Sequence, residues 1–129
     1  MNAMPTILIF EPHALFRQAL ITTIQSRFPE LTIIESETAE DALKNSIVRK
    51  PHLVLMDIHL GNGCGQGLKL LRDIAARQPN TRIAVITDSD DDEYRKAAFQ
   101  RGADYFISKV LPNEGKKILS MIKDTLMET

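Results

Sequence analysis

Four residues that can do chemistry each stand at or just after the end of a short apolar run: Glu11, Asp57, Thr87 and Lys109. Two carboxylates that lie close together repel each other unless a cation shares the site, and such hard oxygen ligands suit Mg²⁺. An ammonium and a hydroxyl at the same place can neutralise and hydrogen-bond a phosphoryl group. These residue types therefore predict phosphoryl transfer to Asp57, with Lys109 and a metal ion neutralising the transferred charge.

The spacing of the apolar residues predicts the elements that must position this group. Runs of strand length cover residues 6–10, 31–35, 52–57, 82–87 and 104–108, and segments with helical spacing follow each of them. Strict alternation of five strands and five helices predicts an α/β fold with a doubly wound, parallel sheet. In the flavodoxin-like strand order 2-1-3-4-5, the ends that carry the four polar residues line one crevice.

Length and composition exclude several classes of protein. The chain has 129 residues, which predicts a single domain that we place at residues 4–127. A formal net charge of -1 gives no electrostatic basis for direct nucleic-acid binding. No apolar run reaches the roughly 18 residues that cross a bilayer, and no cleavable signal is present, so we expect a cytoplasmic protein with no membrane partner. The single cysteine, Cys64, excludes an intramolecular disulfide.

Three segments carry a resemblance to a known family: ILIFEPHALFRQAL, HLVLMDIHL and IAVITDSDDDEYRKAAFQRGADYFISK. Together they resemble the receiver domain of two-component response regulators, in particular the subfamily joined to a helix-turn-helix output domain. The resemblance implies a switch rather than an enzyme, in which Asp57 accepts a phosphoryl group from a histidine kinase or phosphotransfer protein. It also implies that Thr87 and Lys109 contact that group, and that the partners include an output domain or partner protein and a second copy in a homodimer.

The same resemblance implies a metal site and a switch residue. Mg²⁺ is expected between Asp57, an acidic pair after the first strand and the backbone carbonyl of His59, and Phe106 stands where an aromatic residue changes rotamer on activation. Pro12 follows Glu11 where the family has a second acidic residue that usually binds the metal directly. We therefore expect weak Mg²⁺ binding through Glu11, Asp57 and His59.

Other departures from the family pattern leave alternatives open. Asp88 follows Thr87 where a small residue is usual, and it could obstruct the phosphoryl group or lend a carboxylate to the metal. The glycine-rich stretch 61–67 stands in the loop after Asp57, and it fits no nucleotide-binding motif. Because the acidic pair is incomplete, the main alternative function is a pseudo-receiver, a protein-interaction module that works without phosphorylation. A flavin-binding electron carrier would need a phosphate-cradling loop after the first strand, which is missing.

Two of these residues also have purely structural interpretations. Glu11 could be a plain loop carboxylate, and Pro12 suits the first turn of a helix, where its missing amide hydrogen costs nothing. The acidic residues within 88–93 are typical of a helix amino terminus, because the helix dipole favours negative charge there.

Overall fold

The computed structural model describes residues 5–60, 63–88, 91–109 and 114–127. Five strands and five helices alternate along the chain: β1 (Thr6–Phe10), α1 (Ala14–Arg27), β2 (Thr32–Ser36), α2 (Ala39–Arg49), β3 (Leu53–Met56), α3 (Gly65–Arg77), β4 (Arg82–Thr87), α4 (Asp92–Gln100), β5 (Tyr105–Ser108) and α5 (Glu114–Leu126). All strand pairs are parallel and the order is β2-β1-β3-β4-β5. The predicted doubly wound sheet and its strand order are confirmed.

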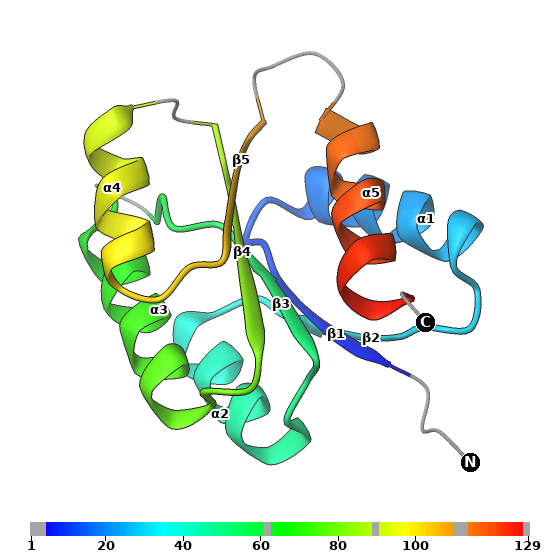
Figure 1. Cartoon of the computed structure of the whole chain (residues 1–129), viewed down its shortest axis with the longest axis horizontal. Helices are drawn as coiled ribbons and strands as arrows, with labels where there is room; N and C mark the ends of the chain where they lie inside the picture. The colour runs from blue at the N-terminus through cyan, green and yellow to red at the C-terminus, as the bar shows by residue number, and fades with distance from the viewer. Residues whose placement is uncertain (1–4, 61–62, 89–90, 110–113, 128–129) are drawn as a thin grey trace.

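Helices cover both faces of the sheet (Figure 1), with α2, α3 and α4 on one side and α1 and α5 on the other. Each face has its own apolar core. Along β1, Leu8 and Phe10 belong to the core under α2 and α3, while Ile7 and Ile9 belong to the core under α1 and α5. Burial on both faces explains why the sequences of such strands are continuous apolar runs. No described helix combines the length and apolar character needed to cross a membrane.

The strand ends that carry the polar residues meet at one edge because the strands are parallel. Phe10 pairs with Met56, so the next residues, Glu11 and Asp57, leave the sheet side by side. The amide of Asp57 donates to the Phe10 carbonyl at 3.0 Å, which extends the strand pairing by one residue. Past β4 and β5, the amide of Lys109 donates to the carbonyl of Thr87 at 2.6 Å.

Helix starts differ from the sequence prediction at one point. The first helix begins at Ala14, and the His13 side chain caps it by accepting from the Phe16 amide at 3.2 Å. Pro12 therefore lies before the cap, and the expectation that it occupies the first helical turn is wrong. The prediction that acidic residues mark the amino terminus of the fourth helix is confirmed among the described residues, because the Asp91 side chain caps α4. Asp90 lies outside the described part of the chain.

The glycine-rich stretch contains a close approach that the sequence analysis did not predict. Residues 61–62 lie outside the described chain, and the rest of the stretch runs into the first turn of α3, which begins at Gly65. A Cβ atom added to Gly67 would lie 2.0 Å from the carbonyl oxygen of Ile58. Glycine at this position lets α3 pack against the segment that follows Asp57.

Candidate functional site

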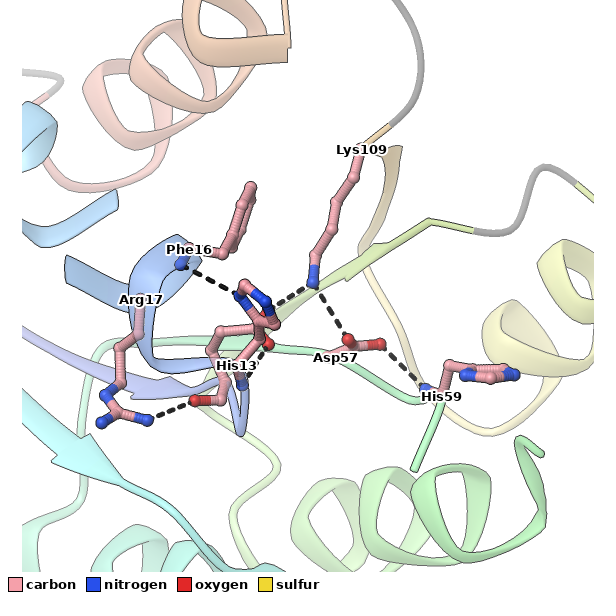
Figure 2. Close-up of polar contacts among 7 residues, drawn as sticks. His13, Phe16, Arg17, Asp57, His59 and Lys109 are labelled. Atoms are coloured by element: carbon pink, nitrogen blue, oxygen red, sulfur yellow. Dashed lines mark hydrogen bonds and ion pairs between the residues drawn. The ribbon is translucent and has the colours of Figure 1, made fainter. Parts of the chain in front are cut away.

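Asp57 is the first residue after β3, and its carboxylate is held from two sides (Figure 2). One oxygen, Oδ2, accepts a hydrogen bond from Lys109 Nζ at 3.0 Å, and Oδ1 accepts one from the His59 amide at 2.8 Å. The residue is only 7% exposed. A carboxylate with both oxygens hydrogen-bonded stays in one orientation. The Asp57 carboxylate is thus held in a fixed position at the edge of the sheet.

Lys109 reaches down from the end of β5 and connects the two buried carboxylates of the site. Its ammonium donates to Glu11 Oε1 as well as to Asp57, and it lies 4.3 Å from the centroid of the Phe16 ring. Burial alone lowers the pKa of Lys109, but the hydrogen bond to Glu11 and the charge of Asp57 outweigh burial and raise it. The lysine therefore remains an ammonium at neutral pH.

Glu11 is the first residue after β1, and it is 3% exposed. While Oε1 accepts from Lys109, Oε2 accepts from the His13 amide at 3.0 Å. The carboxylate of Glu11 therefore faces the site, as the metal-ligand prediction requires. Its role as a metal ligand stays a prediction.

A cavity of about 360 Å³ opens above these groups. Its lining includes both carboxylates and the lysine, and it is formed by Glu11, Pro12, His13, Phe16, Asp57, His59, Asp88 and Lys109. The exposed Asp88 borders the cavity, so its carboxylate adds negative charge near the entrance. Asp57 lines this cavity, so a group that enters the cavity can reach the Asp57 carboxylate.

Two predicted residues do not border the cavity. Thr87, at the end of β4, is fully buried, and it contacts Lys109 through its backbone carbonyl. Phe106 lies in the core on the α2, α3 and α4 side, and the guanidinium of Arg95 covers its ring at 5.1 Å. Of the predicted set, the structure therefore brings together Glu11, Asp57, His59 and Lys109.

Sequence reasoning missed the contributions of the first turn of α1 and of the cap residue before it. His13, Phe16 and Arg17 all contact residues of the site, Arg17 through the Glu11 carbonyl at 2.6 Å. One sequence signal was available for Arg17, since it lies three or four residues before buried Leu20 and Ile21. A charged residue on the apolar face of a helix usually has a specific buried partner.

The chemistry of the donor atoms fits a hard divalent cation. Two buried carboxylates, of Glu11 and Asp57, face one cavity, and oxygen ligands with the remaining positions filled by water are what Mg²⁺ takes in proteins. Among the described residues no group of three or more acidic, histidine or cysteine side chains could hold a metal. Such an ion would therefore depend on two carboxylates, and Pro12 offers no side-chain ligand.

Comparisons with known proteins agree with this geometry. A family model described as the response regulator receiver domain matches residues 7–123. The DNA-binding transcriptional activator DevR/DosR of Mycobacterium tuberculosis is 25% identical over 122 residues, which are 94% of this chain and 54% of that protein. The chain spans about half the length of the curated relatives that it matches.

Solved structures show the same fold. A CheY-like receiver domain protein from Methanospirillum hungatei JF-1 has a TM-score of 0.84 at 21% identity, covering 97% of this chain and 95% of that chain. A response regulator from Burkholderia pseudomallei, solved with a phosphorylated aspartic acid, calcium ion and citrate, has a TM-score of 0.76 at 24% identity. That match covers 95% of this chain and 66% of the other.

Proposed function

Since this chain belongs to the response regulator receiver domain family of two-component systems, we propose that Asp57 accepts a phosphoryl group from a histidine kinase or phosphotransfer protein. The observation that carries the proposal is the setting of the Asp57 carboxylate. It lies at the base of an open cavity, with the Lys109 ammonium on one oxygen and the His59 amide on the other. The phosphorylated aspartic acid in the Burkholderia pseudomallei structure supports the same chemistry.

In the proposed step an oxygen of Asp57 attacks the phosphorus of a phosphohistidine. A P–O bond forms while the P–N bond breaks, and the bonding pair stays on the histidine nitrogen, which is then protonated. Lys109 offsets the negative charge on the phosphoryl oxygens. The hydroxyl of Thr87, a buried residue at the end of β4, hydrogen-bonds the phosphoryl group in this proposal.

We assign Mg²⁺ as the cofactor, held by Glu11, Asp57 and the backbone carbonyl of His59. The bound ion supplies positive charge that shields the incoming phosphoryl group from the two carboxylates. Two features make its affinity weak: Pro12 replaces a carboxylate ligand, and the ammonium of Lys109 already hydrogen-bonds both carboxylates.

Thr87 and Phe106 lie on the neighbouring strands β4 and β5, and this suggests how a change at Asp57 would alter a distant surface. A shift at the end of β4 reaches β5, where Val85 pairs with Phe106, and from there the α4, β5 and α5 surface. We propose that this surface contacts an output domain, a partner protein or a second copy in a homodimer. We propose that residues 4–127 form one receiver domain that works in the cytoplasm, and that DNA binding is a property of an output domain and not of this one. The comparisons give no support to the pseudo-receiver alternative.

The proposal is tested by intact mass after incubation with acetyl phosphate and Mg²⁺. The natural chain is expected to gain the mass of one phosphoryl group, and Asp57→Asn is expected to gain none. Asp124→Asn, an exposed change on α5, is the matched control and should label like the natural chain. Labelling of Asp57→Asn at the natural rate would show that another residue is the acceptor.

A further inference from the structure

Arg17 is a buried cation that the phosphoryl-transfer proposal does not use. Its side chain is 7% exposed, and its guanidinium makes three contacts. Nε donates to Glu35 at 3.1 Å, Nη2 donates to Glu37 at 3.0 Å, and Nη1 donates to the backbone carbonyl of Glu11 at 2.6 Å. Figure 2 shows the guanidinium on the far side of the α1 amino terminus from Lys109.

Ion pairing alone does not account for this arrangement. The partner side chains of Glu35 and Glu37 are 46% and 73% exposed, and ion pairs that open to water contribute little stability. Burying a guanidinium carries a desolvation penalty. The hydrogen bond to the Glu11 carbonyl differs from the two ion pairs because it is itself buried.

We propose that Arg17 is a positioning residue that fixes Glu11 and thereby sets the affinity of the site for Mg²⁺. The proposal rests on the proposed function, because it gives Glu11 the role of metal ligand. Glu35 and Glu37, at the carboxyl end of β2, hold the guanidinium in place. The planar guanidinium carries several N–H donors in fixed directions, so it can hydrogen-bond all of these acceptors at once. A lysine ammonium would make the same contacts with poorer geometry.

The mechanism follows from how the connection between β1 and α1 is fixed. The side chain of Glu11 is held by the His13 amide and Lys109, and its main chain is held by Arg17. Without the guanidinium, the peptide group after Glu11 is freer to rotate, and the carboxylate turns with it. Loss of a group that orients a metal ligand typically lowers metal affinity about 10- to 100-fold.

Arg17 does not border the cavity or contact Asp57 in the described chain, so the effect should fall on metal binding alone. For Arg17→Lys we expect the Mg²⁺ concentration that gives half-maximal labelling by acetyl phosphate to rise about tenfold or more. The labelling rate at saturating Mg²⁺ should stay within about twofold of the natural rate. A residue that merely stabilised the fold would not separate these two quantities.

The deciding experiment measures metal binding and Glu11 positioning without phosphorylation. Backbone amide NMR of the natural chain, Arg17→Lys and Glu35→Gln gives the dissociation constant for Mg²⁺ and, in metal-free protein, the hydrogen exchange rate of the His13 amide. Lys69→Met, which removes an exposed ion pair on α3, is the control. We expect Arg17→Lys to weaken Mg²⁺ binding about tenfold or more and to speed His13 exchange, and Glu35→Gln to shift both in the same direction.

Each outcome has a defined meaning. If the Mg²⁺ dissociation constants and the His13 exchange rates of Arg17→Lys and Glu35→Gln all lie within about twofold of those of the Lys69→Met control, the positioning role is wrong. If Arg17→Lys does not fold, Glu35→Gln alone decides by the same criterion. If the natural chain binds no Mg²⁺ at millimolar concentration, the metal part of the proposed function fails, and His13 exchange then decides whether Arg17 fixes Glu11.

Discussion

At the scale of single residues, the ammonium of Lys109 allows two carboxylates to be buried beside each other. Like charges at such short range repel strongly where water is excluded. Lys109 donates to both Glu11 and Asp57, so the three side chains carry a net charge of one negative unit instead of two. The ammonium therefore offsets the repulsion between the two buried carboxylates.

The raised pKa of Lys109 gives a stability prediction with a defined sign. A cation whose pKa is higher in the folded state contributes stability in full below the unfolded pKa, about 10.4 for lysine. That contribution is lost as pH rises through the raised folded value. We expect the difference in unfolding free energy between the natural chain and Lys109→Met to be constant between about pH 8 and 9.5 and to shrink above about pH 10.4.

Urea titrations across this pH range measure the difference. Lys123→Met, an exposed change on α5, is the control and should show no such loss. A difference that holds steady or grows above the ordinary lysine pKa would contradict the assignment of Lys109 as the buried counter-charge.

Pro12 gives a second prediction at this scale. It borders the cavity, so Pro12→Asp adds a carboxylate beside Glu11 and Asp57. Another charged oxygen ligand should tighten Mg²⁺ binding and speed labelling by acetyl phosphate. Because Pro12 precedes the helix cap, the stability cost comes from a more flexible unfolded chain, about 0.4–1 kcal/mol.

Mg²⁺ titrations followed by NMR and by labelling rate test this change. Pro79→Asp adds the same charge in the loop between α3 and β4, and it should leave metal affinity unchanged. If the natural chain already binds Mg²⁺ as tightly as Pro12→Asp, the missing ligand comes from elsewhere, and Asp88 is the first residue to test.

At the scale of elements, the sequence was informative wherever local pattern decides structure. Alternating apolar runs and helical spacing predicted the sheet, and the sheet brings Glu11, Asp57 and Lys109 together because parallel strands share one carboxyl edge. The burial of Thr87 and the contact of Arg17 with Glu11 depend on packing between separate elements. No local pattern fixes such contacts, so they had to come from the structure.

The contact between α3 and the segment after β3 gives a prediction at this scale. Gly67→Ala places a methyl group 2.0 Å from the Ile58 carbonyl oxygen, so the helix or the segment must shift. We expect a loss of about 1–3 kcal/mol in unfolding free energy, as for other overpacked sites. Gly65→Ala in the same helix meets nothing within 4 Å and should be neutral or stabilising by up to about 1 kcal/mol.

Thermal or urea unfolding of both variants makes the comparison. Since Ile58 adjoins Asp57, the Gly67 variant should also label more slowly with acetyl phosphate. Equal stability of the two alanine variants would mean that α3 does not depend on this close approach.

At the scale of the whole molecule, the fold places the cavity beside Asp57 and the ring of Phe106 in different parts of the protein. The site lies at the carboxyl edge of the sheet, whereas Phe106 and Arg95 meet on the α4 side. The chain spans about half the length of its curated relatives, and the family model of the response regulator receiver domain matches residues 7–123. The proposed output therefore requires that a change at Asp57 reach α4 and β5.

The most direct test of the central claim is to locate the phosphoryl group chemically. Borohydride reduces an aspartyl phosphate to homoserine, so the natural chain is labelled with acetyl phosphate and Mg²⁺, reduced, digested and sequenced by mass spectrometry. We predict homoserine at position 57 and at no other aspartate, with the yield lost when Mg²⁺ is chelated before labelling. Homoserine at position 88, or full labelling with position 57 unchanged, would contradict the account.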